Sequence, residues 1–361
     1  DPHVGFAMEI IRADALARYH RSLGNNVFFN TGTDEHGAKI HEAALKEEED
    51  TQHYVDRFAR RFRELKSLLN LSVDNFIRTT DAHHVSAAQE FWKRCDASGD
   101  IYKKLYKVKY CIGCELEKTD SELSDGKCPL HANRELEVRE EENYFFRFSK
   151  YQQPLLDLYA SKPDFVIPSF RLNEIRAFVE RGLEDFSISR LATKMPWGVP
   201  VPGDTEHVMY VWFDALVNYI SAIGWPDDLP RFHEYWPVIQ YCGKDNNRQQ
   251  SAMWQAMLLS AKLPPSKHIV GQKMSKSLGN VINPYDVIRE FTPHTAFPED
   301  VLRFVLLHDI PSFEDGDLTV ESIKLSYATH LQNGIGNLAS RILRMATTHL
   351  SLPVEVHSFT H

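Results

Sequence analysis

Apolar and polar positions along the chain follow two different periods. Across residues 7–21 the apolar side chains recur at helical spacing, and Gly24 then supplies a helix end. Residues 27–30 form a short apolar run typical of a buried strand, followed by a turn at 31–34. Helical patterns continue across about 38–69 and 83–98. Strands that alternate with helices predict an α/β fold built on a parallel sheet.

The pattern changes after about residue 104. Residues 110–131 form a short, polar segment that contains cysteines. Helical patterns return at 151–161 and 173–182. Strand-like patterns resume after residue 198, with 208–212 as the clearest strand, and the chain is mostly helical from about residue 300. We expect an α/β domain that is interrupted by a small module and followed by helices.

Composition is that of an ordinary globular protein, with 43% hydrophobic and 25% charged residues. The formal net charge of −9 argues against a dedicated basic nucleic-acid-binding module, so any RNA contact would come from local patches. No apolar run approaches the length of a membrane span. We therefore expect no membrane association, and the sequence gives no oligomeric state.

Four potential metal ligands fall in two close pairs. Cys111 and Cys114 are three residues apart, as are Cys128 and His131. Three thiolates and one imidazole fit a closed, structural Zn²⁺ site, which would stabilise this polar stretch. The alternatives are an iron–sulfur centre, for which a histidine is an unusual ligand, and four unrelated loop residues. With five cysteines in all, the pattern favours a reducing, cytoplasmic location over a disulfide framework.

Two further motifs are suited to binding a nucleotide. His3 and Gly5 lie directly before a predicted helix, whose free N–H groups favour a phosphate, although a simple turn is an equally ordinary interpretation. Lys273 and Lys276 enclose small residues in a compact cationic loop, which could neutralise charge on a leaving pyrophosphate. The alternative for this loop is a solvated basic turn.

Together these motifs resemble the two ATP-binding motifs of the class I aminoacyl-tRNA synthetases. Six other segments are similar to blocks of the methionyl-tRNA synthetase family, and the single Cys₃His knuckle matches its one-zinc subtype. The leucyl, valyl, isoleucyl and cysteinyl relatives share the ATP motifs but not this set. The six segments are 31–37, 141–146, 187–190, 196–200, 210–215 and 243–245.

This resemblance implies a Rossmann-type parallel sheet that is split by a zinc-bearing connective insertion and followed by a truncated helical anticodon-binding domain. The implied boundaries are 1–104 and 187–270 for the two halves of the Rossmann catalytic domain, 105–186 for the insertion with the zinc knuckle, 271–325 for the lysine loop and stem-contact region, and 326–361 for the start of the anticodon-binding bundle.

The resemblance also implies a methionine–tRNA ligase, which activates L-methionine with ATP, releases pyrophosphate and transfers methionine to tRNA(Met). Structural Zn²⁺ and ATP-bound Mg²⁺ are the implied metals. The implied site residues are His3, Lys273 and Lys276 for catalysis; these three with Gly5, Gly243 and Asp245 for ATP; Asp34, Arg190, Trp212, Ala215, Tyr219 and Gln250 for methionine; and Asn337 and Arg341 for the anticodon.

The chain departs from the family pattern near its substrates. Phe6 stands where the family's first motif usually ends in a second histidine, which removes one phosphate donor. Gln250 stands where the family has a histidine near the methionine side chain. Two alternatives stay open: a class I synthetase for another amino acid, such as leucine or cysteine, and a catalytically weak RNA-binding paralogue.

Overall fold

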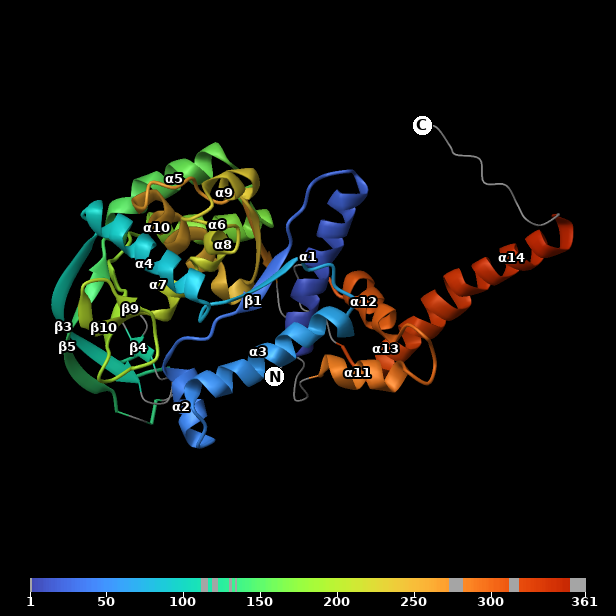
Figure 1. Ribbon diagram of the computed structural model, residues 1–361, viewed down its shortest axis with the longest axis horizontal. Helices are drawn as coiled ribbons and strands as arrows, with labels where there is room; N and C mark the ends of the chain where they lie inside the picture. Colours follow the sequence, from blue (N-terminus) through green and yellow to red (C-terminus); the bar gives the residue numbers. More distant parts are fainter. Residues whose placement is uncertain are drawn as a thin grey trace. The chain divides into compact units, whose positions relative to one another are not determined.

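The computed structural model describes residues 2–111, 116–118, 123–129, 132–133, 135–272, 282–311 and 318–350 (Figure 1). The chain divides into two compact units, each described here by itself. The first unit comprises Ala17–Glu64 and Ser72–Gln272, and the second comprises Pro2–Leu16, Leu65–Leu71 and Lys273–His361.

Parallel strands form two of the sheets in unit one. Strand β1 (Asn30–Thr33) pairs with β2 (Asn75–Arg78), and a second parallel sheet has the order β11-β12-β6. Parallel neighbours need crossover connections, and helices supply them, so the predicted α/β class is confirmed. The strands of the second parallel sheet are β6 (Val166–Ile167), β11 (Ile239–Gly243) and β12 (His268–Gln272). The α-helices of the unit are α2 (Ala38–Lys46), α3 (Thr51–Leu68), α4 (Ala82–Ala97), α5 (Gln152–Ser161), α6 (Ser169–Glu180), α7 (Val211–Ala215), α8 (Asn218–Ser221), α9 (Leu229–Tyr235) and α10 (Trp254–Ser260). Its other short helices are η2 (Phe148–Tyr151), η3 (Lys244–Asn246) and η4 (Gln249–Met253).

Antiparallel strands form two more sheets in the same unit. A long hairpin of β3 (Ile101–Cys111) and β5 (Glu137–Phe146) dominates the sheet β4-β3-β5-β7, and the other sheet has the order β8-β10-β9. The hairpin sheet falls between the parallel strands in sequence, where the insertion is expected. The remaining strands are β4 (Leu116–Lys118), β7 (Phe186–Ser187), β8 (Ser189–Leu191), β9 (Pro200–Val201) and β10 (Asp204–Met209).

Aromatic side chains fill the core of unit one. Phe91 on α4 lies with its ring centroid 5.8 Å from that of Phe213 on α7 and 5.4 Å from that of Trp254 on α10. All three are fully buried. Edge-to-face and tilted ring pairs add to the burial energy, so these contacts fix α4 against the helices that carry the predicted pocket.

Unit two is helical within the described residues. Arg12 on α1 (Val4–Ser22) donates to the carbonyl of Ile310 at 2.6 Å, and Arg303 on α12 pairs with the fully buried Asp14 at 2.6 Å. These bonds join α1 to α12. The other helices are α11 (Pro284–Phe291), α12 (Pro298–His308), α13 (Val320–Ser326), the π-helix η5 (Tyr327–Gly336) and α14 (Asn337–His349). None of the described helices is long and apolar enough to cross a membrane.

Two strand predictions are wrong in position. Strand β1 begins at Asn30 and includes the expected turn, because backbone pairing starts only where the chain meets Asn75 of β2. Strand β10 ends at Met209, and Trp212 lies on α7. In both places the apolar run continues across the end of a strand because the neighbouring segment is also partly buried, and periodicity alone cannot separate the two.

Gly32 permits the close pairing of β1 with β2. A Cβ atom there would lie 2.0 Å from the carbonyl oxygen of Ile77. We expect Gly32→Ala to destabilise the chain by about 1–3 kcal/mol or more, as overpacking does elsewhere, measured by urea unfolding. Gly271→Ala is the matched control, because the nearest atom to its Cβ would lie at 3.7 Å. Equal stability of the two variants would contradict this role for Gly32.

Candidate functional site

The turn after β1 is anchored by the buried Glu35. Its carboxylate accepts two hydrogen bonds from Arg78, at 2.7 and 2.9 Å, and one from the Thr80 hydroxyl at 2.5 Å. The indole N–H of Trp197 donates to the Glu35 carbonyl at 2.7 Å. A bidentate, charge-assisted pair in a buried place fixes geometry strongly. The backbone on either side of Glu35 is therefore held in one conformation.

His36 continues this anchoring through a second carboxylate. Asp214 on α7 is fully buried and lies 2.7 Å from His36 Nδ1 and 2.8 Å from His84 Nε2. Burial raises the pKa of Asp214, but the hydrogen bonds from the two imidazoles outweigh it and hold the pKa below its usual range. An ionised carboxylate only accepts, so both imidazoles donate to it. This triad ties the turn to α4 and α7.

Asp34 directly precedes these two anchored residues and differs from both. The residue is accessible to solvent, but protein atoms crowd its carboxylate, and within the described part of the chain no group hydrogen-bonds that carboxylate. Desolvation by the surrounding protein raises the pKa of Asp34 to about 6, and the charge of Asp214 adds to the rise. A held carboxylate without a partner is suited to bind a cationic ligand group.

The predicted methionine-pocket residues flank Asp214 on the successive helices α7 and α8. Trp212 and Tyr219 are half-buried and Ala215 is buried, at spacings of three and four residues. Residues at such spacings share one face of a helix. Trp212 and Tyr219 also pack against the core of unit one, so the segment offers a partly open aromatic surface.

Gln250 is a buried member of this group. It lies on the π-helix η4, donates from its amide to the Tyr219 hydroxyl at 2.8 Å, and accepts from Gln240 at 3.3 Å. The residue that replaces the expected histidine therefore holds the phenol of Tyr219 in place.

The other predicted ligand-binding residues of unit one lie at strand ends. Gly243 is the last residue of β11, and Asp245 follows it, exposed, on η3. Ligands of open α/β sheets bind outside the carboxyl ends of parallel strands, so this position is suitable for a ribose. Arg190 lies on β8, stacks on the ring of Tyr210 and donates to Ser187 at 2.9 Å.

His3 lies in unit two, at the start of α1. Its Nδ1 accepts from the backbone N–H of Gly5 at 3.1 Å, and burial lowers its pKa. A neutral imidazole whose Nδ1 accepts carries its proton on Nε2. His3 thus caps the helix through Nδ1, and its Nε2–H remains able to donate a hydrogen bond to another group.

Several predicted residues cannot be placed. Lys273, Lys276, Cys114 and His131 lie outside the described residues. The other two knuckle ligands, Cys111 at the end of β3 and Cys128, are both buried.

The predicted anticodon residues lie at the start of α14. Asn337 and Arg341 are exposed and four residues apart on this helix. Their role stays a prediction.

Sequence reasoning missed the supports of the site. Glu35, Arg78 and His84 fix the turn, yet none was singled out as functional. The segment 31–37 contained Glu35 and His36, but only Asp34 was given a role. The charged sequence Thr-Asp-Glu-His directly after a strand was the available signal.

Comparison with known proteins identifies the family. The family model of "tRNA synthetases class I (M)" matches residues 1–136 and 113–343. The chain belongs to this class I synthetase family. The chain is 44% identical over 360 residues to the methionine–tRNA ligase of Thermotoga maritima and 43% identical over 356 residues to that of Brucella suis, which covers 96% and 95% of the chain. The predicted resemblance to the methionyl-tRNA synthetases is confirmed.

A solved class I synthetase structure has the same fold. The crystal structure of Mycobacterium tuberculosis methionyl-tRNA synthetase bound by methionyl-adenylate has a TM-score of 0.88 and 40% identity, and the match covers 97% of this chain and 70% of that one. The chain spans only 56% of the Thermotoga relative and 68% of the Brucella relative.

Asp34 costs the folded synthetase chain stability. Its pKa of about 6 exceeds the value of 3.8 for an unperturbed carboxyl, so the ionised form is disfavoured in the folded state. Stability is then lost as pH rises from about 4 through about 6. We expect Asp34→Asn to raise the melting temperature at neutral pH and to change it little near pH 4, measured by calorimetry. Asp227→Asn, an exposed carboxyl, is the charge control. A lower melting temperature for Asp34→Asn at neutral pH would contradict this account.

Proposed function

We propose that the chain carries the activity of a methionine–tRNA ligase. The observation that carries this proposal is the unpartnered Asp34 carboxylate, whose turn is tied by the His36–Asp214 hydrogen bond to the helix of Trp212 and Ala215. A charged group that binds the α-ammonium of an amino acid is thereby linked to an apolar surface for its side chain. The relatives named above support methionine as that amino acid.

The reaction needs positioning more than a protein nucleophile. Asp34 binds the α-ammonium, which directs the carboxylate of methionine toward the α-phosphate of ATP. The bond to phosphorus forms as pyrophosphate leaves with its electron pair. His3 donates from Nε2 to the phosphate, while Lys273 and Lys276 neutralise the charge on pyrophosphate. Gly5 permits close approach of the phosphate, Gly243 and Asp245 hold the ribose, and Mg²⁺ accompanies ATP.

The methionine side chain is recognised by shape and polarizability. An unbranched thioether packs well against aromatic rings, which Trp212 and Tyr219 supply. Gln250 orients the Tyr219 hydroxyl through the 2.8 Å hydrogen bond. Ala215 leaves room beside these rings, and Arg190 contributes positive charge to the site.

A structural Zn²⁺ completes the proposal. The burial of Cys111 and Cys128 fits thiolates that are enclosed around an ion, with Cys114 and His131 as the other two ligands. Such an ion would stabilise the end of the β3–β5 hairpin.

Transfer of methionine to tRNA(Met) also requires that the chain bind this tRNA. Asn337 and Arg341 share an exposed face of α14, where an amide and a guanidinium can pair with the edges of unstacked anticodon bases. We place this activity in the cytoplasm, where such a ligase meets tRNA.

Exchange of ATP with labelled pyrophosphate tests the activity directly. We expect exchange that depends on methionine and is not supported by leucine or cysteine. Exchange driven by leucine would instead favour another class I synthetase. No exchange with any amino acid would favour a catalytically weak RNA-binding paralogue, an outcome that the missing donor at Phe6 makes worth testing.

The charge of Asp34 predicts a pH dependence. Methionine binds the ionised carboxylate, so its KM should rise as pH falls below about 6 and Asp34 is protonated. Asp34→Asn should raise the KM for methionine by about 100-fold, equivalent to a charge-assisted hydrogen bond of roughly 1.5–3 kcal/mol, and abolish this pH dependence. The KM for ATP serves as the internal control. An unchanged KM for methionine would contradict the assigned role.

Metal analysis tests the knuckle. We expect one equivalent of zinc per purified chain, and its loss in Cys128→Ser together with a lower melting temperature. Cys242→Ser, a buried cysteine on β11, is the control that should retain the metal. Less than half an equivalent of zinc, with Cys111 readily alkylated, would contradict a closed site.

A further inference from the structure

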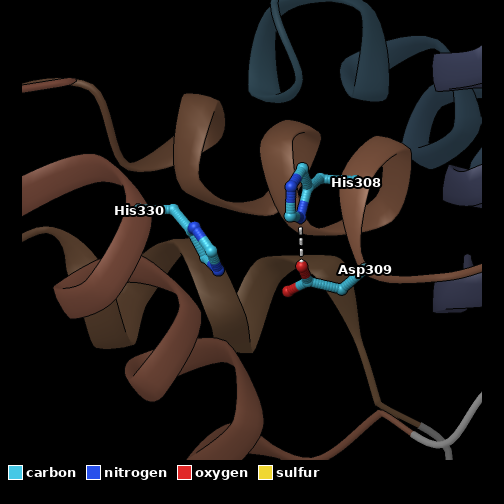
Figure 2. Close-up of side chains that lie close together, drawn as sticks. All are labelled: His308, Asp309 and His330. Carbon is cyan, nitrogen blue, oxygen red and sulfur yellow. Dashed lines mark hydrogen bonds and ion pairs between the residues drawn. The ribbon is translucent and has the colours of Figure 1, made fainter. Parts of the chain in front are cut away.

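Two histidines and an aspartate meet on the surface of unit two (Figure 2). His308 is the last residue of α12, Asp309 follows it as the helix cap, and His330 lies on the π-helix η5. One ligand atom from each side chain lies within 4.8 Å of the others. Residues far apart in sequence thus direct two imidazole nitrogens and one carboxylate oxygen toward a common point.

Ring contacts hold the imidazoles in this arrangement. Phe304 stacks on His308 with ring centroids 4.8 Å apart and planes at 16°. The His308 and His330 rings are also 4.8 Å apart, and Phe304 lies 6.0 Å from His330. A side chain that is already ordered loses less conformational entropy when it binds a ligand.

The carboxylate of Asp309 lies directly beside one of the two imidazoles. His308 Nδ1 lies 2.5 Å from Asp309 Oδ1. The buried Ser326 Oγ has no hydrogen-bond partner of proper geometry among the described residues, so it is available to support a rearranged carboxylate.

The local backbone also favours a cation. The carbonyl groups at the end of α12 give this helix terminus a partial negative charge. The π-helical winding of η5 sets the direction of His330, and such segments frequently occur at functional sites.

We propose that His308, Asp309 and His330 bind one divalent transition-metal ion such as Zn²⁺, with water completing its coordination. Imidazole and carboxylate ligands suit Zn²⁺, Ni²⁺ and Cu²⁺ better than Mg²⁺ or Ca²⁺, which prefer oxygen alone. Ligand atoms around tetrahedral Zn²⁺ lie about 3.3 Å apart, so modest side-chain movements are sufficient. His308 would bind the ion through Nδ1, in place of its hydrogen bond to Asp309, after exchange with solvent moves the ring proton from Nδ1 to Nε2. The site is independent of the Cys₃His knuckle and of the proposed ligase activity.

Binding of this ion would join two elements of unit two. Two ligands come from the end of α12 and one from η5, which leads directly into α14. The ion would therefore oppose separation of η5 from α12.

Calorimetric titration with Ni²⁺ tests the site. The full chain is first given one equivalent of Zn²⁺, which the higher-affinity thiolate ligands take up, and is then desalted and titrated at about pH 7.5, above the ordinary imidazole pKa. We expect one equivalent of Ni²⁺ to bind, and the affinity to fall at least about tenfold in His308→Ala and in His330→Ala. Ni²⁺ should raise the melting temperature of the wild-type chain but not of these variants.

His349→Ala is the matched control, because His349 is another exposed histidine in unit two. It should bind Ni²⁺ as the wild type does. All three variants change exposed side chains, and circular dichroism confirms that each is folded. Absence of Ni²⁺ binding by the wild type, or equal affinity in the wild type and in His330→Ala, would overturn the proposal.

Discussion

The buried carboxylate of Asp214 is the constraint on which the candidate site depends. It accepts hydrogen bonds from His36 in the turn after β1 and from His84 on α4, and it is itself part of α7. An ionised carboxylate without these donors would cost several kcal/mol in so buried a place. The three elements must therefore come together as a set, and the position of Asp34 follows from that requirement.

The same arrangement explains why a destabilising residue is retained. Glu35 and His36 have partners, whereas Asp34, which directly precedes them, has an open carboxylate whose pKa is raised to about 6. A cationic ligand would relieve this unfavourable charge, so the stability lost in the free chain becomes affinity in the bound state. Stability and the proposed methionine binding are thus opposed at a single side chain.

Local pattern was sufficient to predict the helices α1, α4 and α5 and the α/β class. Family resemblance predicts Asp34 and Trp212 as site residues, yet it could not indicate that Glu35 and His84 hold the candidate site together. Those contacts join residues that are more than forty positions apart, and no local period encodes them. Backbone pairing with neighbouring strands also decides where β1 begins and where β10 ends, since a strand extends only as far as its hydrogen bonds to the next strand.

The proposed methionine pocket and the proposed metal site each include a residue on a π-helix. Both described π-helices carry a residue that is central to one of these proposals: Gln250 on η4 and His330 on η5. A π-turn has poorer backbone geometry than an α-turn, so it persists only where the surrounding contacts compensate. On η4 the compensation includes the buried amide network of Gln240, Gln250 and Gln255. On η5 the contacts include the ring of Phe304, 6.0 Å from that of His330, and the Tyr327 hydroxyl, which donates to the His294 carbonyl at 3.2 Å. A metal ion bound to His330 would add a further contact to this short set and so favour the same winding.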